Sequence, residues 1–140
     1  MATLGKLLRL SPAERRLVVQ AAWLILILRV ALTALPYRRV ERLVSRLARR
    51  RAAVLAPTDR IAWAVAAVGR RLPGATCLVQ ALAASIMLAR GGTRAIVRIG
   101  VARERGGPLE SHAWVESEGR VVIGDVHLDR YVPIATWGSS

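Results

Sequence analysis

One cysteine and two histidines are the clearest candidates for nucleophilic chemistry in this chain of 140 residues. Cys77 follows Thr76, which we expect to cap a helix that runs to about Ala89. In the first turn of a helix, unpaired backbone N–H groups and the helix dipole stabilise a thiolate. This position favours a reactive thiol, although a lone cysteine beside Leu78 and Val79 is more often a small core residue.

His112 begins a predicted strand, and Asp125 ends the following one. If the hairpin between them turns at Glu118-Gly119, the two residues become cross-strand neighbours on one face. A cysteine nucleophile needs an imidazole to take its proton and a carboxylate to orient that imidazole. Cys77, His112 and Asp125 therefore form a candidate catalytic triad, provided that the cysteine helix packs against this hairpin.

Other assignments of these residues stay open. His112 can be an ordinary strand histidine and Asp125 a turn residue, with His127 as the functional imidazole and Asp129 as its orienting carboxylate. Two histidines and one cysteine at these spacings predict no metal site. The only lysine is Lys6, so a phosphate-binding loop with its lysine is also absent from the sequence.

The first element that must support this site is a long apolar helix. Ser11, Pro12 and Glu14 form a helix-start signature with a capping box, and residues 18–35 leave no polar face. Such a length approaches that of a membrane span, but Arg29 near its centre makes insertion costly. We therefore favour a helix buried in the domain or against a partner.

A basic amphipathic helix follows Pro36. Apolar residues recur at helical spacing through residues 40–47, with arginines on the other faces. Of the formal net charge of +13, most lies in residues 1–60, which carry 13 Arg and Lys against 3 acids. This surface suits an acidic partner, lipid headgroups or phosphates, or is simply a solvated face. With no Phe and only two Tyr, the chain is short of most of the stacking residues expected of a single-strand or RNA binder.

The remaining pattern predicts an α+β fold in one globular domain. Thr58 is expected to cap a third helix, with Trp63, Val65 and Val68 turned inward, and Gly91-Gly92 to end the cysteine helix. From residue 94 the chain is rich in Val and Ile, with hairpin turns, which predicts antiparallel strands. One cysteine and no signal-peptide pattern favour the cytoplasm.

The ordered motifs of residues 70–134 resemble the leader peptidases of lasso-peptide biosynthesis, which are transglutaminase-like cysteine proteases. The matching features are Pro73 before Cys77-Leu78, an Ala/Leu-rich helix, the run "IGV", the motif "HAWVE" from His112, and Asp125. The Arg-punctuated apolar segments before residue 57 are similar in style to the region that precedes this domain. The resemblance implies a transglutaminase/papain-like core at 57–140 and a helical docking region at 1–56.

The resemblance also implies a function. Cys77 would attack the scissile carbonyl of a ribosomally made lasso precursor, His112 would act as base and then acid, and Asp125 would orient His112. Trp114 and Gln80 would contact substrate, although the family more often has Arg in place of Gln80. The precursor's leader peptide, a separate leader-recognition protein and a lasso cyclase would be the partners, and no cofactor would be required.

Two further functions remain open from the residues alone. The chain could be a non-catalytic basic adaptor at a membrane or partner surface, in which case the arginines of residues 38–51 matter most. It could also perform acyl transfer with the same triad, with an amine replacing water as acceptor. Residues 18–35 would then be a docking surface for a partner protein, or an element that associates a cytoplasmic protein with a membrane.

Overall fold

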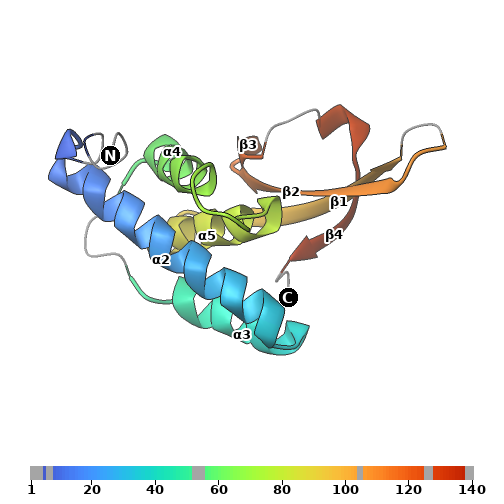
Figure 1. Cartoon of the computed structure of the whole chain (residues 1–140), viewed down its shortest axis with the longest axis horizontal. Helices are drawn as coiled ribbons and strands as arrows, with labels where there is room; N and C mark the ends of the chain where they lie inside the picture. The colour runs from blue at the N-terminus through green and yellow to red at the C-terminus, as the bar shows by residue number, and fades with distance from the viewer. Residues whose placement is uncertain (1–4, 6–7, 52–55, 104–105, 125–127, 138–140) are drawn as a thin grey trace.

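Helices come first along the chain and a four-stranded sheet follows (Figure 1), which confirms the predicted α+β order. The computed structural model describes residues 5, 8–51, 56–103, 106–124 and 128–137. The helices are α2 (Pro12–Ala34), α3 (Tyr37–Ala48), α4 (Thr58–Gly69) and α5 (Cys77–Arg90). The strands are β1 (Ile96–Arg103), β2 (Leu109–Ser117), β3 (Arg120–Ile123) and β4 (Val132–Trp137), and the 3-10 helix η1 (Leu128–Arg130) precedes β4.

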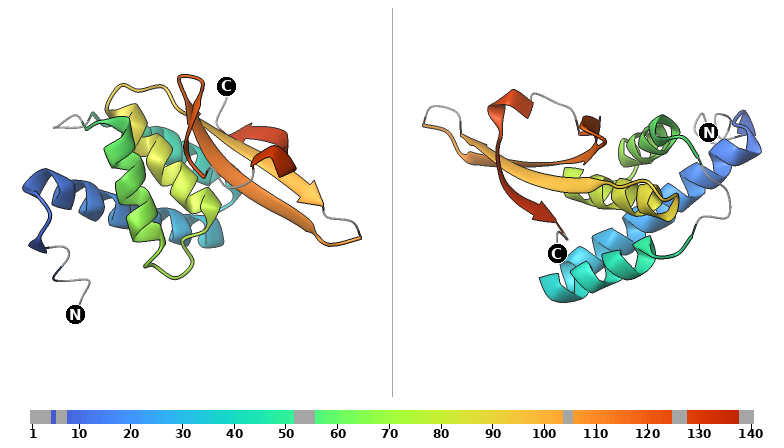
Figure 2. Two further views of the ribbon diagram at one scale, coloured as in Figure 1. Left: turned by 90° about the horizontal axis from the view of Figure 1, so that it is seen from above. Right: turned by 180° about the vertical axis from the view of Figure 1, so that it is seen from behind.

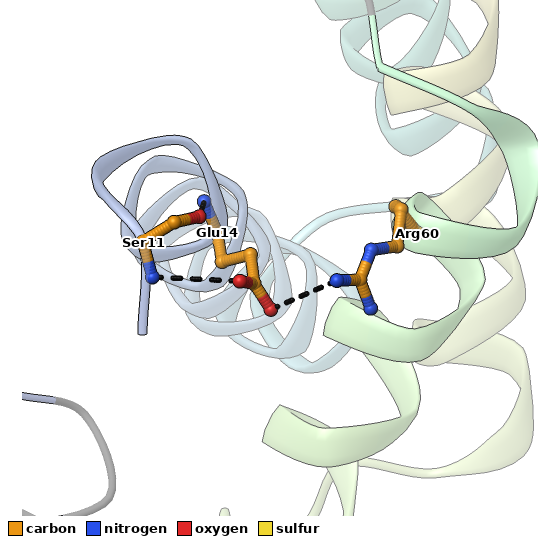
Figure 3. Close-up of polar contacts among 3 residues, drawn as sticks. All are labelled: Ser11, Glu14 and Arg60. Atoms are coloured by element: carbon orange, nitrogen blue, oxygen red, sulfur yellow. Dashed lines mark hydrogen bonds and ion pairs between the residues drawn. The ribbon is translucent and has the colours of Figure 1, made fainter. Parts of the chain in front are cut away.

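The predicted capping box at the start of α2 is present. The Ser11 hydroxyl accepts the backbone N–H of Glu14 at 3.2 Å, and the Glu14 carboxylate accepts the backbone N–H of Ser11 at 3.4 Å. Figure 3 shows that the same carboxylate also reaches across to Arg60 of α4, at 3.2 Å. The cap therefore starts α2 and also ties it to a neighbouring helix.

The start of α4 differs from the expectation, because Thr58 is its first residue rather than its cap. Pro57, with extended backbone angles, is the N-cap, and its carbonyl accepts the N–H groups of Arg60 and Ile61. Val65 and Val68 are buried as predicted, whereas Trp63 is only half-buried and has the Arg60 guanidinium 5.5 Å from its ring centroid.

Helix α5 lies at the centre of the helical layer. Eight of its 14 residues are buried, and α2 crosses it with α4 and α3 on either side (Figures 1 and 2). A single core cluster joins buried residues of all four helices to Val97, Val115 and Trp137 of the sheet. Residues before and after position 57 therefore share one hydrophobic core.

The sheet is antiparallel in the order β3-β2-β1-β4. The turn between β2 and β3 falls at Glu118 and Gly119, which both have positive φ, as a tight hairpin of this length requires. Ser117 pairs with Arg120 as predicted, and the register then shifts by one residue between Glu116 and Val115. Strand β4, which we did not predict, pairs with β1 at the edge of the sheet.

The two faces of the sheet have different surroundings. Side chains alternate along a strand, and on β2 it is Ala113 and Val115 that belong to the core shared with α5. His112 and Trp114 therefore lie on the opposite face, close to the chain that leads into β4, where Tyr131 lies. The pairing of Gly100 with His112 leaves space on this face for the Trp114 ring.

Candidate active site

Cys77 is the first residue of α5, as the sequence predicted, and it is half-buried at the edge of the core. Thr76 is the N-cap, and its hydroxyl accepts the backbone N–H of Val79 at 3.3 Å. The N–H groups of Cys77 and Leu78 have no acceptor among the residues that the structure describes. Two backbone donors are thus available beside the thiol, an arrangement that can stabilise a thiolate or a developing oxyanion.

The turn that leads into Cys77 is held by a residue of α2. Gly74 has φ +79, and a Cβ added there would overlap the guanidinium of Arg29. Its carbonyl accepts the N–H of Thr76 at 3.0 Å. Arg29, which interrupts the long apolar segment of α2, therefore packs on the backbone three residues before the cysteine.

Gln80 braces the same turn from within α5. Its side-chain amide donates to the carbonyl of Ala75 at 2.9 Å, and its carboxamide lies so close to Gly69 that a Cβ there would overlap it. Gln80 thus connects the end of α4 to the cap of α5. Its amide nitrogen already has an acceptor, so the predicted contact with substrate would have to compete with this bond.

His112 is held by one backbone carbonyl. Its Nε2 lies 2.7 Å from the oxygen of Gly124, the residue that follows β3. A carbonyl oxygen can only accept, so Nε2 must carry the proton, and in the neutral ring Nδ1 is then the unprotonated nitrogen. Nδ1 has no hydrogen-bond partner in the described part of the chain. The imidazole is consequently set to accept a proton at Nδ1.

Trp114 is buried beside His112, with 6.1 Å between their ring centroids. Its indole N–H donates to Glu116 at 3.0 Å, and Arg98 donates to the other carboxylate oxygen at 2.7 Å. The Trp114 hydrogen bond, with the Arg98 guanidinium, holds the pKa of Glu116 below its ordinary value. Trp114 thus has a structural role beneath His112, and a part in substrate binding stays a prediction.

The structure places Cys77 and His112 on two elements that pack together, without joining the two residues. Helix α5 packs against β2, so Cys77 and His112 belong to adjacent elements, but no hydrogen bond connects the two residues. His112 lies on the sheet face turned away from the helical core. Asp125 and His127 lie outside the described residues, and Asp129 is exposed on η1.

Two contributors to this site were not foreseen from the sequence. The carbonyl of Gly124 is the partner of His112, and the Tyr131 ring lies 5.2 Å from the imidazole. A glycine at the end of a Val/Ile-rich strand is a signal for unusual backbone geometry, and Gly124 has φ +87. Among the described residues, no three His, Cys, Asp or Glu side chains gather as metal ligands would.

The structure defines an α+β protein in which a central helix, with a cysteine as its first residue, packs on an antiparallel sheet that carries a histidine. The family model of the transglutaminase-like superfamily matches residues 16–136, and the chain belongs to this superfamily. The match begins within α2 and so includes the helices that precede the cysteine. No curated protein and no solved structure matches the chain.

Proposed function

We propose that this protein is a cysteine peptidase that cleaves the leader peptide from a ribosomally made lasso-peptide precursor. The observation that supports the proposal is the position of Cys77 at the capped N-terminus of α5, a helix that packs against the strand on which the Gly124 carbonyl holds Nε2 of His112. Membership of the transglutaminase-like superfamily supports thiol chemistry at this position. The motif that starts at His112 supports the lasso-precursor assignment.

In the proposed reaction, Nδ1 of His112 takes the thiol proton of Cys77. The thiolate then attacks the scissile carbonyl carbon, and the N–H groups of Cys77 and Leu78 donate to the resulting oxyanion. When the C–N bond breaks, His112 returns the proton to the leaving amine, which is the new N-terminus of the core peptide. Water, deprotonated by His112, hydrolyses the thioester, releasing the leader carboxylate and the free thiol.

This reaction requires the thiol and the imidazole to meet at the β2 edge, near the first turn of α5. Strand β3 pairs only with residues 115–117 of β2, and beside His112 this edge is contacted by Gly124, which would have to give way for the thiol to reach Nδ1. We propose Asp125 as the group that orients the imidazole in the reacting state. Gly124, whose carbonyl now holds Nε2, immediately precedes it in the sequence.

The first experiment measures the rate of Cys77 alkylation by iodoacetamide as a function of pH, read by intact mass. Cys77 is the only cysteine, so each added mass reports on this thiol alone. An ordinary thiol has a pKa of about 8.5. We expect fast labelling that persists well below this pH, because the proposed imidazole partner and the helix terminus would stabilise the thiolate. In His112→Ala, the labelling curve should move toward that of an ordinary thiol.

The matched control is His127→Ala, which removes the other histidine of the chain. The proposal predicts that this variant keeps the wild-type curve. A curve that ignores His112 but shifts in His127→Ala would overturn the assignment of the base. An ordinary thiol curve in all three proteins would leave no activated nucleophile and would favour the adaptor function.

The substrate is tested with a lasso precursor added to the purified chain, with and without its leader-recognition protein. Hydrolysis yields a leader with a free carboxylate, whereas acyl transfer to an added amine yields a leader that carries that amine. Mass analysis of the leader fragment separates the two products. We propose hydrolysis, with the cyclase acting on the core peptide after release, in the cytoplasm.

A further inference from the structure

Helix α2 exposes a continuous apolar surface along the side opposite to the core. Its members recur every three to four residues, which places them on one face of the helix. They are Val19, Trp23, Leu26, Ile27 and Val30, named here the outer stripe. Trp23 and Val30 are each 63% exposed, so neighbouring elements do not cover the stripe. It extends over about 16 Å of the helix axis.

The opposite side of α2 is part of the protein core. Ala21, Leu24, Ile25, Leu28 and Ala31 are buried against the other helices and the sheet. By length and composition alone, α2 is the one described helix that could cross a membrane. A spanning helix would have to leave this core, whereas a helix that lies on a surface keeps it and uses only the outer stripe.

The charges around the outer stripe are basic. Arg16 is exposed three residues before Val19, on the same side of α2. Helix α3, which follows α2 in the chain, presents Arg38, Arg42, Arg46 and Arg49 along a shallow concavity that also includes Glu41. The only acidic residue of α2, Glu14, is turned toward its own cap and toward Arg60 (Figure 3).

We propose that the outer stripe of α2 lies in the interface of an anionic lipid membrane, with α2 parallel to the surface. An apolar stripe with Arg16 beside it, on a helix followed by the arginine-rich face of α3, matches acyl chains beside anionic headgroups. Trp23 lies within the stripe, and indole rings favour the boundary between headgroups and acyl chains. A protein partner would need an apolar groove bordered by acidic residues, whereas an anionic bilayer supplies both features throughout its surface.

The test is flotation of the full chain with phosphatidylcholine vesicles and with vesicles that contain equal parts of phosphatidylcholine and phosphatidylglycerol. We expect binding to the anionic vesicles that weakens as salt rises. Trp23→Glu combined with Val30→Glu should reduce partitioning at least about tenfold, because both side chains leave the acyl boundary. Arg16→Gln should reduce it about fivefold, the effect of one arginine near an anionic surface.

A matched control places the same charges on another exposed apolar pair. Val132 and Ile134 of β4 are 66% and 62% exposed, so Val132→Glu combined with Ile134→Glu changes the net charge equally. This control should bind within about twofold of wild type. Equal loss in both double variants, or no binding to anionic vesicles, would overturn the proposal. If the protein self-associates without vesicles, and Trp23→Glu combined with Val30→Glu abolishes that association, the stripe would instead bind a second copy of the chain.

Extraction of the bound protein with alkaline carbonate distinguishes a surface helix from a span. The proposal predicts complete release, whereas retention in the membrane would show that α2 crosses it. All of these measurements are repeated with Cys77→Ser, which removes the candidate nucleophile. Vesicle binding should be unchanged in that variant, because the lipid proposal does not depend on the proposed peptidase.

Discussion

The Nε2 of His112 lies 2.7 Å from the carbonyl oxygen of Gly124, and this contact sets the tautomer of the only histidine that the structure describes. The carbonyl can be placed there because Gly124 adopts φ +87, which side-chain-bearing residues rarely do. A Cβ at Gly124 would lie 2.9 Å from the carbonyl oxygen of Ala113. One glycine therefore sets both the backbone geometry directly after Ile123 and the tautomer of the imidazole.

Gly124→Ala tests this relationship. We expect the free energy of unfolding to fall by about 1 to 3 kcal/mol, because alanine at positive φ is strained and its Cβ is crowded by β2. Alkylation of Cys77 should shift toward that of an ordinary thiol, since His112 loses its partner. The measurements are urea unfolding and the labelling curve.

Gly119→Ala supplies the comparison for Gly124→Ala. Gly119 also has positive φ, at +76, but nothing lies within 4 Å of an added Cβ. This variant should lose stability without changing the labelling of Cys77. A shift of the labelling curve in both variants would attribute the effect to general loosening of the hairpin.

Removal of the Thr76 cap is a second test of the site. Thr76→Ala should lower the free energy of unfolding by about 1 kcal/mol, because the N–H of Val79 loses its acceptor. Fraying of the first turn of α5 should also slow alkylation of Cys77 at pH 7. Thr76→Ser keeps the hydroxyl and should behave as wild type, so a defect in both variants would count against capping as the cause.

The sequence predicted the elements that local signals define. Ser11, Pro12 and Glu14 predicted the start of α2, Thr76 predicted the start of α5, and Glu118-Gly119 predicted the β2–β3 turn. Each of these features depends on residues within a few positions of one another. Local chemistry therefore placed Cys77 at a helix terminus correctly.

Features that depend on distant contacts were not predictable in the same way. Strand β4 was missed because Pro133 argues against a strand, and only its edge position beside β1 tolerates that residue. The register of β2 and β3 was right near the turn, but no local signal predicted the shift beyond Glu116, where Val122 has no partner in the pairing. The face of the sheet on which His112 lies follows from which strand residues the helices cover.

The ion pair between Glu116 and Arg98 predicts a pH dependence of stability. The pKa of Glu116 is lowered in the folded protein, first by the hydrogen bond from Trp114 and then by Arg98. Stabilisation is therefore fully present above the pKa of the unfolded carboxyl and is lost as pH falls through the folded pKa. Glu116→Gln should cost about 1 kcal/mol at pH 7, because the pair is partly exposed.

The measurement is urea unfolding of wild type and Glu116→Gln between pH 7 and pH 3. The difference between the two proteins should shrink as acid protonates Glu116 in the wild type. Glu110→Gln is the comparison, since Glu110 is more exposed and lies 3.7 Å from Arg130. A difference for Glu116→Gln that stays constant to pH 3 would contradict the assignment of the lowered pKa to this carboxylate.

The contact between Gly69 and Gln80 predicts a strong energetic coupling at the turn before Cys77. Gly69→Ala should lower the free energy of unfolding by about 1 to 2 kcal/mol, since the added methyl displaces the Gln80 carboxamide from the Ala75 carbonyl. In a Gln80→Ala background the three atoms nearest to this methyl are removed, and alanine gains up to about 1 kcal/mol of helix propensity over glycine. The sign of the Gly69→Ala effect should therefore reverse between the two backgrounds, as a double-mutant cycle of unfolding energies measures. Additive effects would show that Gln80 does not brace the end of α4, and its amide would then be available to substrate, as the sequence alone suggested.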